Sequence, residues 1–125
     1  MRKLVCTLWA GLLLAAQNPA VAQSNSDPAA RANQMAYSLA LKCFIAYGSA
    51  RSDAKDLGRI SEAQAYETKA RSSFDVGNKL GTVLHYSGTR VNQDFGLAQA
   101  DELPKMVKDK AYLKKTLAYC EAAGF

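Results

Sequence analysis

The chain has 125 residues, of which 49% are hydrophobic, and its 16 basic and 11 acidic side chains give a formal net charge of +5. This length is enough for one domain. With 22% charged residues, the composition excludes both a disordered tail and a membrane protein with several spans.

Residues 1–22 have the pattern of a secretory signal. Arg2 and Lys3 precede an apolar run over residues 4–16, and Ala20-Val21-Ala22 supplies the small residues that signal peptidase requires. The apolar run is shorter than the roughly 20 residues that span a bilayer. We therefore expect Sec-type export with cleavage near Ala22, and a periplasmic or secreted product without stable membrane insertion.

Cleavage would leave a single domain over residues 23–125 with a net charge of +3 and two cysteines, Cys43 and Cys120. Cys6 would leave with the signal. Because an even pair of cysteines in an oxidising compartment normally becomes oxidised, the sequence predicts a disulfide between Cys43 and Cys120.

Residues 23–125 contain 17 alanines against ten β-branched residues, which favours helices over strands. The first helix is predicted to start at Asp27-Pro28, an N-cap followed by proline. Its apolar side chains recur every three or four residues, and we expect it to end near Gly48 or about a turn later. Residues 52–59 are polar and are predicted to form a loop.

A second helix is predicted to begin with a capping box at Ser61 and Gln64 and to end at Tyr86-Ser87-Gly88. Its apolar stripe includes Gly77 and Gly81, one helical turn apart. Glycine lowers helix stability by about 1 kcal/mol relative to alanine. We therefore expect another helix or an aromatic ring to approach this pair closely.

Two further helices are predicted. Asn92 can cap a short one over residues 92–100, and Asp101 can cap a last one over residues 102–123, since Pro104 is tolerated in a first turn. Gly124 then occupies the position that follows a helix end.

The fold class is thus predicted to be all-α: a small bundle of three long helices and a short connecting helix, held by one disulfide. If Cys43 lies near the end of the first helix and Cys120 near the end of the last, the same ends of these helices must meet. This favours an up, down, up arrangement of the three long helices.

No catalytic, cofactor-binding or metal-ligating constellation is present, and the sequence predicts neither an enzyme nor a cofactor. His85 lacks a histidine or acidic partner at helical spacing. One alternative is a haem held by His85 with Met35 or Met106 as the second ligand, although no C-x-x-C-H motif is present.

Tyrosine and lysine give the best hint of a binding surface, because tyrosine buries area while keeping a polar group and is enriched at interfaces. Nucleic acid is a poor candidate for an exported chain, and the basic residues lack interleaved aromatics. The candidate surface residues are Tyr37, Tyr86, Tyr112, Tyr119, Lys105, Lys108 and Lys115.

These features predict a non-enzymatic envelope protein that acts as a binding or interaction module, for which a periplasmic protein is the candidate partner. An exported helical domain with one disulfide is similar in plan to several periplasmic groups, among them immunity proteins that block secreted cell-wall enzymes. Two alternatives therefore stand beside a general interaction module: an inhibitor or immunity protein, and a carrier of a small apolar ligand or haem.

Overall fold

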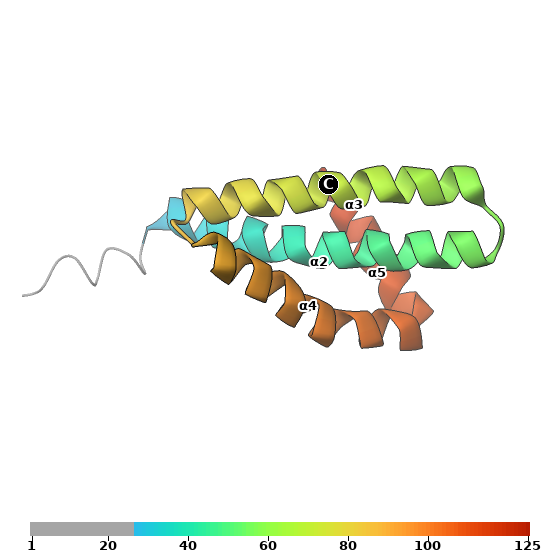
Figure 1. The fold of residues 1–125 in the computed structure, drawn as a ribbon. Coiled ribbons are helices and arrows are strands. Elements are labelled where there is room, and N and C mark those ends of the chain that lie inside the picture. The colour runs from blue at the N-terminus through green and yellow to red at the C-terminus, as the bar shows by residue number, and fades with distance from the viewer. Residues whose placement is uncertain (1–26) are drawn as a thin grey trace, which may run out of the picture.

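The computed structural model describes residues 27–125, which form four helices and no strand. The helices are α2 (Pro28–Asp56), α3 (Ile60–Val83), α4 (Gly88–Lys108) and α5 (Lys110–Ala122), as Figure 1 shows. The predicted all-α bundle is confirmed, and so is its disulfide, which joins Cys43 to Cys120 with their Cα atoms 5.7 Å apart. The predicted signal at residues 1–22 lies outside the described residues.

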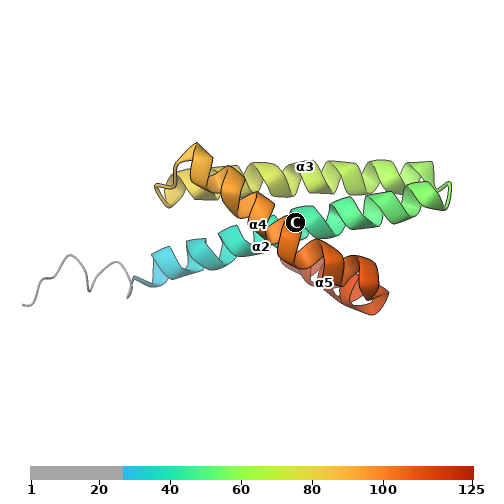
Figure 2. The same cartoon turned by 60° about the horizontal axis from the view of Figure 1, so that its bottom comes forward.

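α2 is the central helix and lies side by side with α3 in both views (Figures 1 and 2). It begins as predicted, with the Asp27 side chain accepting a hydrogen bond from the Ala29 backbone N–H. It then continues through Asp56, so the loop predicted from residue 52 onward is wrong. Ala50 and Ala54 are buried. Two of the polar residues between them pair with the neighbouring helices, Arg51 with Glu67 of α3 and Asp53 with Lys110 of α5. Burial of the small side chains therefore overrides the polar composition.

α3 begins at Ile60 without the predicted capping box. Its N-cap is Arg59, which makes no side-chain capping hydrogen bond, and Ser61 lies inside the helix. The chain enters α3 from Gly58, whose φ of 70° is a conformation that glycine adopts without strain. A three-residue connection set by this glycine places the start of α3 directly beside the end of α2.

α4 is longer than the helix predicted over residues 92–100. Its N-cap is Ser87, whose hydroxyl accepts from the Arg90 backbone N–H, and it continues past Asp101 with Pro104 in its interior. Proline deprives the carbonyl four residues earlier of its donor, but that residue, Ala100, is exposed to water. The fully buried Met106 anchors the turn after the proline.

The break before the last helix therefore comes at Asp109, between α4 and α5, and not at Asp101. The Asp109 side chain accepts hydrogen bonds from the backbone N–H groups of Ala111 and Tyr112 and caps α5. The bundle thus contains three long helices and one short helix, and the short one is the last and not a connection. Gly124 follows α5 with a φ of 88°, as predicted.

α5 runs back along α2 in the opposite direction, at an oblique angle visible in Figures 1 and 2. Lys110, at its start, pairs with Asp53 near the end of α2, with Nζ 2.7 Å from Oδ2. Cys120, near its end, bonds to Cys43 in the middle of α2.

The three long helices do run up, down and up, because α4 follows α2 in the same direction, with Tyr37 beside Asp94 and Lys42 beside Glu102. The prediction that the disulfide joins parallel helices is wrong, since Cys120 belongs to the short α5, which runs antiparallel to α2.

Three apolar clusters form the core, and α2 contributes to all of them. One joins Tyr37 and Leu41 to α4, one surrounds the disulfide, and one packs Ile45 and Ala46 against Met106 and Leu113. Because α5 has only 13 residues, it covers only the C-terminal half of one side of α2. The N-terminal half of that side stays open to solvent.

Candidate functional site

A groove runs between the N-terminal half of α2 and the outer side of α5. We call it the α2/α5 groove. It consists of two hollows of about 570 and 400 Å³, which share Leu39, Lys42 and Tyr119. It is lined by Arg31, Gln34, Met35, Ala36, Ser38, Leu39 and Lys42 of α2 and by Tyr112, Lys115, Thr116 and Tyr119 of α5.

Helical spacing places these side chains on two facing stripes. On α2, Met35 and Leu39 are four residues apart and Lys42 follows three residues later, so all three project from one face. On α5, Tyr112 and Tyr119 are two turns apart on one face. The Cys43–Cys120 disulfide lies where α5 crosses α2 and fixes the distance between the stripes.

Apolar side chains are unusually open to water in this groove. Met35 is 73% exposed and Tyr119 is 64% exposed, while Leu39 between them is half-buried. Thr116 is buried and donates its hydroxyl hydrogen bond to the Tyr112 carbonyl, 2.8 Å away, within α5. The floor therefore has no unpaired polar side chain at this position and offers mainly apolar contact.

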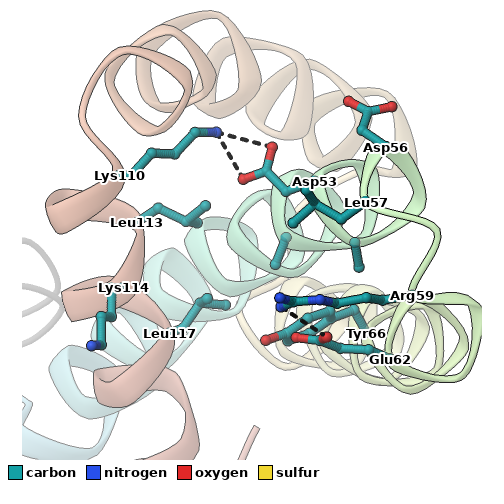
Figure 3. A pocket seen from close by; sticks show the side chains of 12 residues that line it. Asp53, Asp56, Leu57, Arg59, Glu62, Tyr66, Lys110, Leu113, Lys114 and Leu117 are labelled. Atoms are coloured by element: carbon teal, nitrogen blue, oxygen red, sulfur yellow. Dashed lines mark hydrogen bonds and ion pairs between the residues drawn. The ribbon is translucent and has the colours of Figure 1, made fainter.

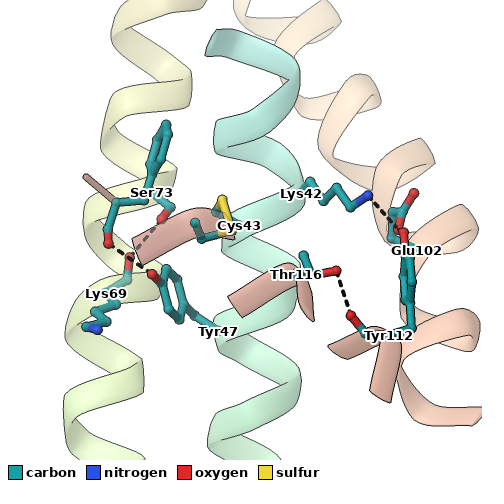
Figure 4. Close-up of a disulfide and its surroundings, with 10 residues drawn as sticks. Lys42, Cys43, Tyr47, Lys69, Ser73, Glu102, Tyr112 and Thr116 are labelled. Carbon is teal, nitrogen blue, oxygen red and sulfur yellow. Dashed lines mark hydrogen bonds and ion pairs between the residues drawn. A yellow bond between two sulfur atoms is a disulfide. The ribbon is translucent and has the colours of Figure 1, made fainter. Parts of the chain in front are cut away.

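The rim of the groove is cationic. The Lys42 ammonium lies 5.1 Å from the centroid of the Tyr112 ring and 3.8 Å from the Glu102 carboxylate, and the Tyr112 hydroxyl donates to the same carboxylate at 2.6 Å. Figure 4 shows these three residues together beside the disulfide. Lys115 makes no ion pair or hydrogen bond within the described part of the chain. The two lysines, Lys42 and Lys115, outnumber the single carboxylate of Glu102, so this rim has a net positive charge. The Tyr112 ring helps to hold the Lys42 ammonium in place.

Three of the predicted surface residues come together in this groove: Tyr112, Tyr119 and Lys115. Tyr37 does not, because it is buried, and its inclusion in an exposed surface is wrong. Its hydroxyl donates to Asp94 at 2.9 Å. Burial raises the pKa of Tyr37 above its ordinary value, and the hydrogen bond to Asp94 raises it further.

The other predicted surface residues lie on α4 or before it. Tyr86 is half-buried, with its ring edge-on to Tyr37 and the Arg90 guanidinium 3.6 Å from its centroid. Lys105 pairs with Asp101 at 2.9 Å and lies 3.4 Å from Glu102. Lys108 is exposed in the last turn of α4. The basic residues expected on one last helix are therefore divided between two helices.

Sequence reasoning missed the half of the groove that α2 supplies. Met35 and Leu39 are among the apolar residues of the first predicted helix that recur every three or four positions, a spacing typical of a core stripe. Nothing local distinguishes them from the buried Ala40 or Cys43. Only the length of α5 and its crossing point on α2 leave them uncovered, and both depend on the break at Asp109.

A second hollow of about 490 Å³ lies on the other side of α5, where α2 ends and α3 begins. Figure 3 shows two ion pairs on opposite sides of it, Lys110 with Asp53 and Arg59 with Glu62. Three acidic and three basic residues line it, and Lys114 is one of the basic ones. Its charges thus largely balance, unlike those of the α2/α5 groove.

The residues considered for haem binding are not brought together. His85 is exposed, has a φ of 59°, and lines a hollow beside the start of α2. Met106 lies in the core and Met35 lies in the α2/α5 groove, so neither lines that hollow. Within residues 27–125, no group of three His, Cys, Asp or Glu residues could hold a metal ion.

Comparisons of the chain with protein-family models, with curated proteins and with solved structures found no match. Among the described residues, no helix has the length and apolar character needed to cross a membrane.

Proposed function

We propose that this chain is an exported protein of the bacterial envelope that works by binding another protein and has no catalytic role. The observation that carries the proposal is the α2/α5 groove, where Met35 and Tyr119 expose apolar surface beside the Lys115 ammonium. Exposed apolar surface rimmed by polar groups is typical of protein interaction sites. Tyrosine is also among the residues that dominate binding energy at interfaces.

Two features support export. The sequence begins with a cleavable signal pattern. The disulfide between Cys43 and Cys120 is compatible with an oxidising compartment. Both cysteines are fully buried, which fits a structural crosslink better than a redox site, because redox cysteines need access to their partners.

A protein partner fits the hollows better than a small apolar ligand does. The interior of the bundle is filled by large side chains, with Tyr47 and Met106 completely buried. Carriers of small apolar ligands enclose most of the ligand surface, whereas the α2/α5 groove is open along its length. An inhibitor or immunity protein is a special case of this proposal, with one tight partner.

Native mass spectrometry on protein isolated from the envelope of the cells that make it tests the proposal. We expect a chain that begins at Gln23, has lost two protons to the disulfide, and retains a protein partner. A retained small molecule would favour the carrier instead. A chain with residues 1–22 intact in the cytoplasmic fraction would contradict export.

A further inference from the structure

We propose that the α2/α5 groove docks an acidic amphipathic segment of the protein partner. Apolar side chains of the segment would contact Met35, Leu39 and Tyr119, and its carboxylates would meet Lys42 and Lys115. This inference rests on the proposed function and adds to it the site and the chemical class of the partner.

The positive charge of the residues that line the groove is the reason for expecting an acidic partner. Lys42 and Lys115 line the groove on either side of Tyr119, and no acidic side chain lines either hollow. Glu102 lies outside the lining and is 3.8 Å from Lys42, so it offsets only part of this charge. In the balanced hollow on the other side of α5, three acidic residues accompany three basic ones. Complementary charge across an interface steers association and selects the partner.

The shape and length of the groove favour an inserted peptide segment. Arg31 and Lys42 are 11 residues apart on α2, which corresponds to roughly 16 Å of helix. This matches about three turns of a partner helix. An amphipathic helix that lays its apolar stripe into an open apolar groove is a common mode of recognition.

The energetic roles follow from burial. Tyr119 and Met35 have the most exposed apolar area to bury and should act as the anchors. Lys115 makes no ion pair within residues 27–125, so an incoming carboxylate would not have to displace an existing partner. Because the rim is solvent-exposed, the contribution of its charge should fall as salt rises.

Two designed peptides of about 14 residues test the inference, since this length gives close to four helical turns. Both have the same leucine stripe, and the polar positions are glutamate in one and lysine in the other. Each is titrated into the ¹⁵N-labelled, disulfide-bonded protein. We expect the glutamate peptide to bind and to shift the amide resonances of Leu39, Lys42, Lys115 and Tyr119. Equal or tighter binding of the lysine peptide, or shifts outside the groove, would overturn the inference.

Two neighbouring lysines provide a matched control. Lys115→Glu should weaken binding of the glutamate peptide by about tenfold, because an attraction becomes a repulsion, and Tyr119→Ala should do the same, because it removes an anchor. Lys114→Glu makes the same charge change one residue away, on the side of α5 that faces the balanced hollow, and should leave the affinity within about twofold. Equal losses in Lys114→Glu and Lys115→Glu would show a nonspecific charge effect and would also overturn the inference.

Vesicles of phosphatidylglycerol test whether the groove binds anionic lipid headgroups instead of an acidic protein segment. The inference predicts no binding that depends on Lys115. Vesicle binding that Lys115→Glu abolishes and Lys114→Glu preserves would assign the groove to lipid headgroups instead. These experiments use purified protein and do not depend on export. The peptide tests can therefore fail even if the chain is exported and binds a partner at another surface. They can also succeed even if the chain is not exported.

Discussion

Gly81 of α3 lies against Val91 of α4 so closely that a Cβ atom built on the glycine would be 2.6 Å from Val91 Cγ2. One turn earlier, Gly77 faces the Phe95 ring in the same way, with a Cβ atom 2.9 Å from Cζ. The pair thus allows close contact between α3 and α4, where Val91 and Phe95 form part of the core. The close approach predicted from the glycine spacing is confirmed, and both a helix and an aromatic ring are involved.

Gly81→Ala should lower the free energy of unfolding by about 1–3 kcal/mol, because Val91 has little rotamer freedom with which to move away. Gly48→Ala, inside α2, is the matched control, since a Cβ there meets nothing within 4 Å. It should raise stability by roughly 0.5–1 kcal/mol. Urea denaturation measures both. The same sign of change in the two variants would contradict this helix contact.

The disulfide should contribute a large share of the stability. It closes a sequence separation of 77 residues, for which the chain-entropy model gives about 4 kcal/mol. The double variant Cys43→Ala, Cys120→Ala should therefore unfold at a much lower urea concentration than the wild type. Alkylation of the wild type in denaturant without reductant should label neither Cys43 nor Cys120, because both are fully buried in the native state and become accessible only on unfolding. Labelling of either cysteine would contradict the crosslink.

The break between α4 and α5 predicts different roles for two aspartates. Asp109→Ala removes the side chain that caps α5 and should cost about 1 kcal/mol. Asp101→Ala removes an exposed residue in the middle of α4 whose side chain pairs with Lys105, and it should cost much less. Thermal unfolding of the two variants measures and compares these losses of stability. A larger loss in Asp101→Ala would place the helix break at residue 101.

Stability should fall at alkaline pH. Burial raises the pKa values of Tyr37, Tyr47 and Tyr66 above their ordinary value near 10. Because the folded state holds these protons more tightly than the unfolded state, the stabilisation is complete below pH 10 and is lost as pH rises further.

Tyr37→Phe should cost about 1 kcal/mol at pH 7, since the hydrogen bond to Asp94 is lost. Above pH 10 its stability should fall less steeply than that of the wild type, because one of the three groups no longer titrates. Unfolding free energies measured from pH 7 to 12 test this. Parallel curves for the two proteins would show that Tyr37 takes no part in the alkaline loss.

Local signals in the sequence were sufficient to predict several features of the structure. Asp27-Pro28 starts a helix because both the cap and the proline act on the adjacent turn. The cysteine pairing follows from there being two candidates after the predicted cleavage. Gly124 ends the last helix because glycine tolerates a positive φ. None of these features needs knowledge of what packs against them.

Features that depend on tertiary contact were not predictable in this way. Asp101 and Asp109 can each cap a helix, and the choice between them goes with the burial of Met106 in the core. That choice shortens α5, reverses its direction relative to α2, and uncovers Met35 and Leu39. The tyrosine and lysine stripe of α5 could be derived from helical spacing alone, but the groove could not.

The most direct test of protein binding at the α2/α5 groove is photocrosslinking in living cells from two similarly exposed positions. One variant carries benzoylphenylalanine in place of Tyr119, which is 64% exposed in the groove, and the other carries it in place of Leu97, which is 69% exposed on α4. The proposal predicts one discrete protein adduct from position 119 and none from position 97 at equal abundance. No adduct from position 119, or the same adducts from both positions, would contradict it.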